Sequence, residues 1–283
     1  MDIYREMLLR LQAVYDEGEA RAVAFLVLET AFGITRTDVY ADKDRDFSAE
    51  ERQVLQNILS RLLHCEPVQY VLGEAWFDGL RLNVTPATLI PRPETEELVR
   101  LVRDYARLRY PDGAFSVLDA GTGSGCIAIA LKHRFPAARV AAWDNSAEAL
   151  AVARKNARQL GTEVAFSLAD ILADPPVPNL PLPLLLVSNP PYVCQHEAEE
   201  MLPQVRDYEP GTALFVPDDD PLHFYRALSR IGRKSEAEAV FLEVNRAYAE
   251  AVATLLRQDG WAHAEVHRDA FDNARFVVGK TDC

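Results

Sequence analysis

The feature that most limits the fold of this chain is an apolar run that ends in a stiff polar tetrapeptide. Residues Leu184–Ser188 read Leu-Leu-Leu-Val-Ser, and Asn189-Pro190-Pro191-Tyr192 follows directly. A continuous run of Leu and Val is typical of a strand that is buried on both faces of a parallel sheet. Ligands of such open sheets bind beyond the carboxyl ends of the strands, so Asn189 is predicted to lie at a ligand site.

The two prolines make this segment a source of hydrogen-bond acceptors. Proline fixes φ and carries no N–H, and the residue before a proline is held in extended backbone. The carbonyls of Asn189 and Pro190 are therefore not used by a helix, and the side chain of Asn189 offers one more acceptor. This pattern favours a ligand with an NH2 group, with the ring of Tyr192 packed over something planar. The simpler interpretation is a proline-rich loop that only ends the strand.

From Ser116 onward, strand patterns alternate with helical patterns, which indicates a parallel sheet. Helices are expected at 126–135, from the capping residue Ser146 onward, and at 248–256, whereas 189–238 shows no clear period. The expected strands lie at 116–120, 139–143, 163–168, 184–188, 239–244, 262–267 and 275–279. The last two are joined by a short link and are predicted to form a hairpin at one edge. The predicted fold class is α/β, a doubly wound and mostly parallel seven-stranded sheet.

The first 73 residues follow a different pattern, which predicts a small helical domain. An apolar segment at 20–31 ends before Gly33, and Ser48 with Glu51 forms a capping box. Helical faces are expected to carry Met7, Leu11, Val14 and Tyr15, and then Val54, Leu55, Ile58, Leu59 and Leu62. The Asp78-Gly79 pair predicts a β-hairpin. We therefore expect three parts: a helical domain at 1–73, a linking β-hairpin at 74–88 and a larger α/β domain at 89–283.

Composition narrows the class of protein. The chain has 283 residues, of which 49% are hydrophobic, enough for a substantial core. The formal net charge of -13 argues against a partner held mainly through phosphates. The four cysteines are far apart without metal-ligand spacing, so we expect reduced thiols and no metal site. The chain shows neither a targeting pattern nor a long apolar run, so we expect a cytoplasmic protein that contacts no membrane.

A glycine-rich loop follows the first expected strand. Its glycines let a ligand press against bare backbone, and their spacing, G-x-G-x-G, differs from the dinucleotide fingerprint and from a Walker loop, which needs a lysine. An ordinary tight turn is the alternative. Acidic residues on the same rim suit an amino group or ribose hydroxyls. The loop and these acids comprise Asp119, Gly121, Thr122, Gly123, Ser124, Gly125, Asp144 and Asp170.

Together these motifs resemble those of class I S-adenosylmethionine-dependent methyltransferases. More closely, the chain is similar to the protein-(glutamine-N5) methyltransferases that act on bacterial peptide-chain release factors. Three further stretches match that family's pattern: Gln69–Gly73, Leu89–Thr95 and Tyr208–Pro210. The similarity spans about Glu66 to Gly279, and the helices before it are similar only in size and character. Two segments depart from the pattern, Pro217–Pro221 and Glu243–Arg246, where substrate choice or efficiency could differ.

The resemblance implies a methyltransferase sheet, S-adenosyl-L-methionine as cofactor, and a role for each matching residue. Asp144 would hold the cofactor ribose, and Asp170 with Ile171 would border the adenine. The predicted cofactor-binding residues are Asp119, Gly121, Thr122, Gly123, Ser124, Gly125, Asp144, Asn145, Asp170, Ile171 and Asn189. The predicted catalytic residues are Asn189, Pro190 and Tyr192, and the predicted substrate-binding residues are Asn189, Pro190, Pro191, Tyr192, Arg92 and Glu94.

The residues also suit methylation of an amide. An amide nitrogen is a poor nucleophile because its lone pair is delocalised, so two acceptors that orient its N–H bonds would act mainly by positioning. His133 and His196 are predicted to be surface residues, and no general base is expected, since the proton can leave after methylation. Arg92 and Glu94 lie in or beside a proline-stiffened loop, Pro91–Pro93, that is expected to enter a helix at Thr95. They either only start that helix or act in the site by gating or by contact with the substrate backbone.

The predicted function is methyl transfer to the glutamine of a Gly-Gly-Gln loop in class I release factors, recognised by residues 1–73. The expected protein is a monomer that does not bind nucleic acid directly. One alternative is an adenine or cytosine amino-methyltransferase, because an exocyclic amine poses the same acceptor problem and such enzymes use a similar tetrapeptide. The other is a non-catalytic adaptor in translation, which would be expected to lose the glycine loop or Asn189, and both are present.

Overall fold

The computed structural model describes residues 3–41, 46–173, 175 and 179–282. Its chain divides into two compact units. Unit 1 consists of Met1–Glu74 with Leu202–Tyr208, and unit 2 consists of Ala75–Met201 with Glu209–Cys283. Among the helices of the described ranges, none combines the length and the apolar character that a membrane span requires.

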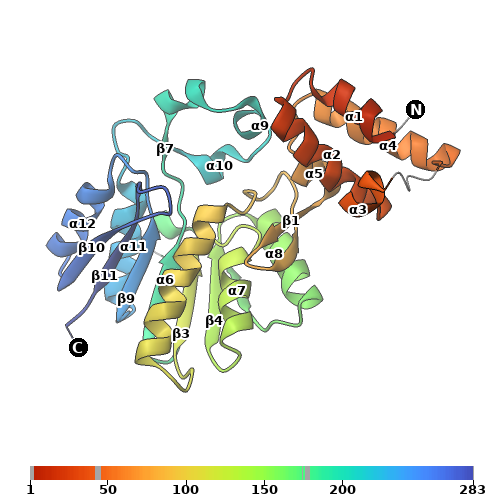
Figure 1. Ribbon diagram of the computed structural model, residues 1–283. Helices are drawn as coiled ribbons and strands as arrows, with labels where there is room; N and C mark the ends of the chain where they lie inside the picture. Colours follow the sequence, from red (N-terminus) through yellow and green to blue (C-terminus); the bar gives the residue numbers. More distant parts are fainter. Residues whose placement is uncertain (1–2, 42–45, 174, 176–178, 283) are drawn as a thin grey trace. The chain divides into compact units, whose positions relative to one another are not determined.

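Unit 1 is helical, as predicted. It contains α1 (Ile3–Leu11), α2 (Glu17–Phe32), α3 (Arg36–Tyr40), α4 (Ala49–Leu63), α5 (Val68–Leu72) and α9 (Pro203–Arg206) (Figure 1). The apolar faces of α1, α2 and α4 form one buried core. Helix α2 ends at Gly33 in the left-handed region, and α4 begins with the Ser48–Glu51 capping box, so both predicted helix boundaries are confirmed.

Two residues predicted on the core faces of these helices lie at the surface. Val14 is 38% exposed because α1 already ends at Leu11. Val54 is 47% exposed because the buried stripe of α4 begins at Leu55, one residue and about 100° further around the helix. The prediction is therefore wrong for these two valines and confirmed for the other core positions of the same helices.

Unit 2 contains the seven-stranded sheet, in the order β10-β11-β9-β6-β3-β4-β5. Its parallel strands are β3 (Ser116–Ala120), β4 (Arg139–Asp144), β5 (Ala165–Leu168), β6 (Leu184–Ser188) and β9 (Ala239–Glu243). The antiparallel pair β10 (His263–Arg268) and β11 (Ala274–Lys280) forms the predicted hairpin, with β11 paired to β9. The α/β fold class is confirmed, and the third strand is two residues shorter than predicted.

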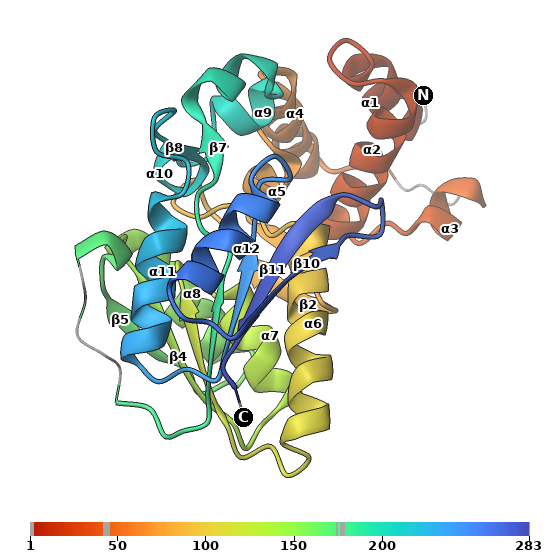
Figure 2. The same cartoon turned by 90° about the vertical axis from the view of Figure 1, so that its left-hand side faces the viewer.

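Helices cover both faces of the sheet (Figures 1 and 2). Helices α6 (Pro93–Arg109), α7 (Cys126–Arg134) and α8 (Ala147–Gln159) lie on one face, and α11 (His223–Lys234) and α12 (Ala249–Gln258) lie on the other. The packing of β6 explains why its first four residues are all apolar. Leu185 and Val187 belong to the core under α6 and α7, whereas Leu184 and Leu186 belong to the core under α11 and α12.

The predicted Asp-Gly hairpin is present in unit 2 as β1 (Glu74–Phe77) and β2 (Leu80–Asn83). Asp78 and Gly79 have φ of 51° and 77°, the positive values that a two-residue hairpin loop of type I′ requires. Phe77 and Leu82 are buried in the core that α6 and α7 share, and Arg134 of α7 pairs with Asp78.

The region 189–238, which shows no clear period in the sequence, contains several short elements and one long helix. The short elements are β7 (Val193–Cys194), the 3-10 helix η2 (Gln195–Glu200), α10 (Gly211–Leu214) and β8 (Phe215–Val216), and a further 3-10 helix, η1 (Ile171–Ala173), follows β5. The long helix, α11, was not predicted, although its buried residues Tyr225, Leu228 and Ile231 do repeat at helical spacing.

Candidate active site

The chain order of the strands creates the place for a site. Strand β3 pairs with β4 on one side and with β6 on the other, so connections leave this point in opposite directions. Ligands of open α/β sheets bind at such a switch point, outside the carboxyl ends of the strands. A cavity lies there, lined by residues that follow β3, β4, β5 and β6.

Most predicted site residues come together around this cavity. Those that line it are Arg92, Gly121, Thr122, Gly123, Ser124, Asp144, Asn145, Asp170, Ile171, Asn189 and Pro191. The predicted site residues Glu94, Asp119, Gly125, Pro190 and Tyr192 are not among the lining residues.

The glycine loop forms the inner wall. The N–H groups of Gly121 and Thr122 donate to the carbonyl of Trp143 at 2.9 and 2.8 Å, which fastens the loop to β4. Gly123 has φ of 55°, and a Cβ built there would meet nothing within 4 Å, so this backbone borders open space. A Cβ at Gly125 would lie 2.9 Å from Ile129 Cδ1, so this glycine instead permits close packing of α7.

Asp119 supports the loop from behind. Its side chain is fully buried, and Oδ2 accepts from Thr122 Oγ1 at 2.6 Å and from the N–H of Ala128 at 3.1 Å. Burial raises the pKa of Asp119 to about 7, and the charge of Asp144 adds to this rise. In this position Asp119 holds the shape of the loop.

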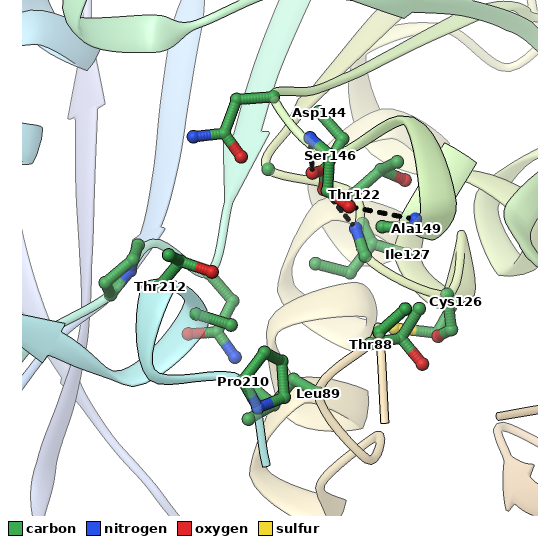
Figure 3. Close-up of a pocket in the computed structure, with 18 of the residues that line it drawn as sticks. Thr88, Leu89, Thr122, Cys126, Ile127, Asp144, Ser146, Ala149, Pro210 and Thr212 are labelled. Atoms are coloured by element: carbon green, nitrogen blue, oxygen red, sulfur yellow. Dashed lines mark hydrogen bonds between the residues drawn. The ribbon is translucent and has the colours of Figure 1, made fainter. Parts of the chain in front are cut away.

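Asp144 lies at the end of β4 and is held in place by backbone donors. Oδ2 accepts from the N–H of Gly123 at 2.8 Å, and Oδ1 accepts from the N–H of Ser146 at 2.9 Å. Ser146 in turn caps α8 by accepting from the N–H of Ala149 at 3.1 Å (Figure 3). Each carboxylate oxygen has a second lone pair, so this fixed carboxylate can still accept from hydroxyls of a ligand.

Asn189 lies on the other side of the site, within a buried hydrogen-bond network. Its Nδ2 donates to Thr95 Oγ1 at 3.1 Å, and Thr95 Oγ1 donates to Glu243 Oε2 at 2.8 Å. Tyr192 donates from its hydroxyl to Glu243 Oε1 at 3.2 Å, and its ring packs against the core under α11 and α12. Glu243 is 1% exposed, and burial raises its pKa to about 7.

The outer wall is formed by two loops that a buried carboxylate joins. Glu209 accepts from the N–H of Ile90 at 3.1 Å and from Nη2 of Arg92. The loop before α6 and the segment after Glu209 both line the cavity, and Figure 3 shows Pro210 and Thr212 across the cavity from Thr122 and Asp144. Arg92 therefore already has a protein partner at the cavity wall.

The two segments that depart from the family pattern contact the loop after β6. Asn245 donates to the carbonyl of Tyr192 at 3.2 Å and to Glu197 Oε2 at 3.1 Å. Asp218 accepts from the backbone N–H of His196 at 3.1 Å and lies 2.8 Å from its Nδ1. His196, like His133, is exposed, as predicted. These contacts brace the loop and do not add a titratable group to the cavity.

One group in the described part of the chain could offer three metal ligands. Atoms of Cys194, His196 and Asp218 lie within 4.8 Å of one another. His196 and Asp218 hydrogen bond to each other, and Cys194 Sγ lies 3.5 Å from the hydroxyl of Tyr248. Protein partners thus account for all three, and the absence of a metal site stays a prediction. Cys65, Cys126 and Cys194 are free thiols, and Cys283 lies outside the described residues.

Three buried polar residues that organise the site were not predicted as site residues from the sequence: Thr95, Glu209 and Glu243. The sequence does indicate a site role for Glu243, because this acidic residue ends an otherwise apolar strand at the edge of the sheet where ligands bind. Glu209 follows Tyr208 in a stretch that was noted only for its family resemblance. Thr95 was taken to mark the beginning of a helix, and nothing in its local sequence indicates that it contacts Asn189.

Comparisons with known proteins agree with this geometry. Residues 2–73 match the family model described as PrmC N-terminal domain, and residues 108–208 match the model described as methyltransferase small domain. The catalytic domain of hMettl16, solved in complex with MAT2A 3′UTR hairpin 6, is similar in fold, with a TM-score of 0.56 and 13% identity over 85% of this chain and 84% of that chain.

Two curated relatives extend the similarity over nearly the whole chain. The release factor glutamine methyltransferase of Bacteroides thetaiotaomicron is 40% identical over 95% of this chain and 95% of its own length. The protein of the same name from Flavobacterium psychrophilum is 34% identical over 94% of each chain. The chain therefore belongs to the release factor glutamine methyltransferase family of methyltransferases.

Proposed function

We propose that this enzyme transfers a methyl group from S-adenosyl-L-methionine to the side-chain nitrogen N5 of the glutamine in the Gly-Gly-Gln loop of class I peptide-chain release factors. The observation that carries the proposal is that Asp144, the glycine loop and Asn189 line one and the same cavity. The relatives' shared name supports the choice of a release factor glutamine as substrate.

The residues that line the cavity fit the proposed cofactor. The fixed carboxylate of Asp144 can accept from two ribose hydroxyls, and the backbone at Gly123 borders open space. Ile171 offers an apolar surface beside Asp170 for the adenine. Ser124 lines the same cavity and adds a polar side chain to this wall. When bound, S-adenosyl-L-methionine supplies the electrophilic methyl group.

The proposed contribution of the protein to the chemistry is positioning. Asn189 Oδ1 and the carbonyl of Pro190 would accept the two N–H bonds of the substrate amide, which directs the nitrogen lone pair at the methyl group. Pro191 lines the cavity beside them, and Tyr192 keeps the segment in place through Glu243. The proton would leave the nitrogen after methylation, so the mechanism requires no strong base.

We further propose roles for the parts of the chain. Residues 1–73, which match the N-terminal family model, would recognise the folded release factor. The hairpin within 74–88 would link them to residues 89–283, which carry the chemistry. The net charge of -13 supports a protein substrate over direct binding of nucleic acid. We propose that the enzyme acts in the cytoplasm as a monomer.

The test is incubation of the full-length enzyme with S-adenosyl-L-methionine and a purified release factor, followed by mass spectrometry of a tryptic digest. Single- and double-stranded DNA serve as parallel substrates at low salt, where electrostatic binding is strongest. The expected result is one methyl group on the loop glutamine, none on DNA, and loss of methylation in Asn189→Ala. Methylated adenine or cytosine would favour the nucleic-acid alternative, and bound cofactor without any methyl transfer would favour the adaptor.

A further inference from the structure

The carboxylate of Glu243 is connected to the side chain of Asn189 through one hydroxyl. Glu243 ends β9, Thr95 lies in the first turn of α6, and Asn189 follows β6, so three separate elements meet here. Thr95 Oγ1 lies 2.8 Å from Glu243 Oε2 and 3.1 Å from Asn189 Nδ2. Thr95 is 2% exposed and Glu243 is 1% exposed, so these contacts are shielded from water.

The donors and acceptors that Glu243 and Thr95 can offer determine the orientation of the side-chain amide of Asn189. An ionised carboxylate only accepts hydrogen bonds, and a hydroxyl has one proton to donate. While Glu243 is ionised, Thr95 donates that proton to it, so toward Asn189 the oxygen of Thr95 can only accept. The amide must therefore present its NH2 group to Thr95, and its Oδ1 points away from Thr95.

The same carboxylate also holds the other end of the tetrapeptide. Tyr192 donates from its hydroxyl to Glu243 Oε1 at 3.2 Å, and the carbonyl of Tyr192 accepts from Asn245 Nδ2 at 3.2 Å. The end of β9 thus fixes both Asn189 and Tyr192. A fully buried carboxyl group is costly unless it is hydrogen-bonded, and this one has a partner on each oxygen.

We propose that Glu243 and Thr95 are positioning residues for methyl transfer, which hold the amide of Asn189 with its oxygen toward the substrate amide. This inference rests on the proposed function. If Thr95 instead donated to Asn189, the amide would turn over and present its NH2 group to the NH2 group of the substrate. Two donors would then face each other, and the substrate nitrogen would lose the acceptor that orients it.

The decisive variants are Thr95→Val, which removes the hydroxyl at nearly constant volume, and its matched control Thr95→Ser, which keeps the hydroxyl. Thr95→Val should lower kcat about tenfold, the effect of one lost hydrogen bond in the transition state. The Kd for the cofactor should stay close to that of the unaltered enzyme, whereas the unfolding midpoint should fall, because Oε2 of the buried Glu243 loses its donor. Thr95→Ser should recover most of the lost kcat.

A double variant tests whether Thr95 acts through Asn189. In an Asn189→Ala background, Thr95→Val should lower kcat no further, because the group that it orients is already absent. A merely structural role for Thr95 would lower kcat by the same factor in both backgrounds. The inference would be overturned if Thr95→Val had the same kcat as the unaltered enzyme. It would also be overturned if Thr95→Val and Thr95→Ser lowered kcat by the same factor.

A measurement without substrate separates this inference from the proposed function. In 15N-labelled enzyme, the side-chain NH2 signals of Asn189 are identified by their loss in Asn189→Ala. Their exchange with solvent should be slow in the unaltered enzyme and in Thr95→Ser, and faster in Thr95→Val. Unchanged exchange in Thr95→Val would refute the connection even if the release factor is methylated, whereas an inactive enzyme with the expected exchange would refute only the proposed substrate.

Discussion

Replacing Arg92 by alanine should destabilise the enzyme although the residue lies at a cavity wall. The reason is that the side chain of Glu209 is 1% exposed and that Arg92 is one of its two donors, the N–H of Ile90 being the other in the described part of the chain. Removing one partner of a fully buried ion pair costs about 3 to 5 kcal/mol. The side chain of Arg92 is 32% exposed, so in the variant water can partly replace the guanidinium as a partner of Glu209. We therefore expect a smaller loss of about 2 kcal/mol in the free energy of unfolding.

Urea unfolding of a double-mutant cycle measures this loss. Glu209→Gln keeps an acceptor for the N–H of Ile90 but removes the charge. The double variant Arg92→Ala/Glu209→Gln should therefore lose about 1 kcal/mol less free energy of unfolding than the sum of the losses in the two single variants. The matched control is Arg100→Ala in α6, the helix that Arg92 precedes, where Arg100 Nη2 lies 3.5 Å from Glu96 Oε2 in a more exposed pair. That control should cost about 0.5 kcal/mol or less. If Arg92→Ala costs no more than Arg100→Ala, the buried pair does not hold the two loops together.

Asp144→Ala should weaken binding of S-adenosyl-L-methionine by about 1 to 3 kcal/mol, and an unchanged Kd in calorimetric titration would remove Asp144 from the ribose site. Alanine strains the backbone at both Gly123 and Gly125, because both have positive φ, but Gly125→Ala should lower the unfolding midpoint more, because its Cβ would also clash with Ile129 of α7. Gly123→Ala should in addition weaken cofactor binding, because its Cβ would enter the open space beside the loop; equal effects of the two variants on both measurements would contradict this division. Burial raises the pKa of Glu243 to about 7, so kcat should rise as the pH passes 7, and a Glu243→Gln enzyme with the same pH profile would exclude this carboxyl as the cause. Between the ordinary carboxyl pKa and pH 7, Glu243 is protonated in the folded chain and ionised in the unfolded chain. The free energy of unfolding should therefore fall as the pH rises toward 7, and this fall should be smaller in Glu243→Gln. The titratable and charged groups that face Glu243 are Glu94, Cys126, Tyr192, Tyr225 and Arg275.

Those parts of the fold that local patterns determine could be predicted from the sequence. Leu184–Val187 is apolar at every position because both faces of β6 are covered, and this pattern indicated a buried strand of a parallel sheet. Asp144 and Asn189 were placed at one edge because the carboxyl ends of parallel strands share that edge. Both residues line the same cavity.

What could not be predicted depends on contacts between distant residues. Thr95 and Glu243 are 148 positions apart, and Ile90 and Glu209 are 119 positions apart, so no local period or spacing reveals either contact. Asp119 was assigned to the ligand because it ends a strand, but the turn of the glycine loop places it behind Thr122 and away from the cavity. The side chain that a strand end presents to a ligand is thus decided by the loop that follows.

The central claim is that the methyl group is transferred to an amide nitrogen, and acid hydrolysis of the methylated release factor tests it most directly. A glutamine methylated on N5 yields methylamine when its side-chain amide is hydrolysed, whereas a methyl ester on a carboxylate yields methanol. With S-adenosyl-L-methionine labelled in the methyl group, the account predicts that the label appears in methylamine and that a substrate lacking the loop glutamine yields none. Label recovered in methanol, or in methylamine from that altered substrate, would contradict the account.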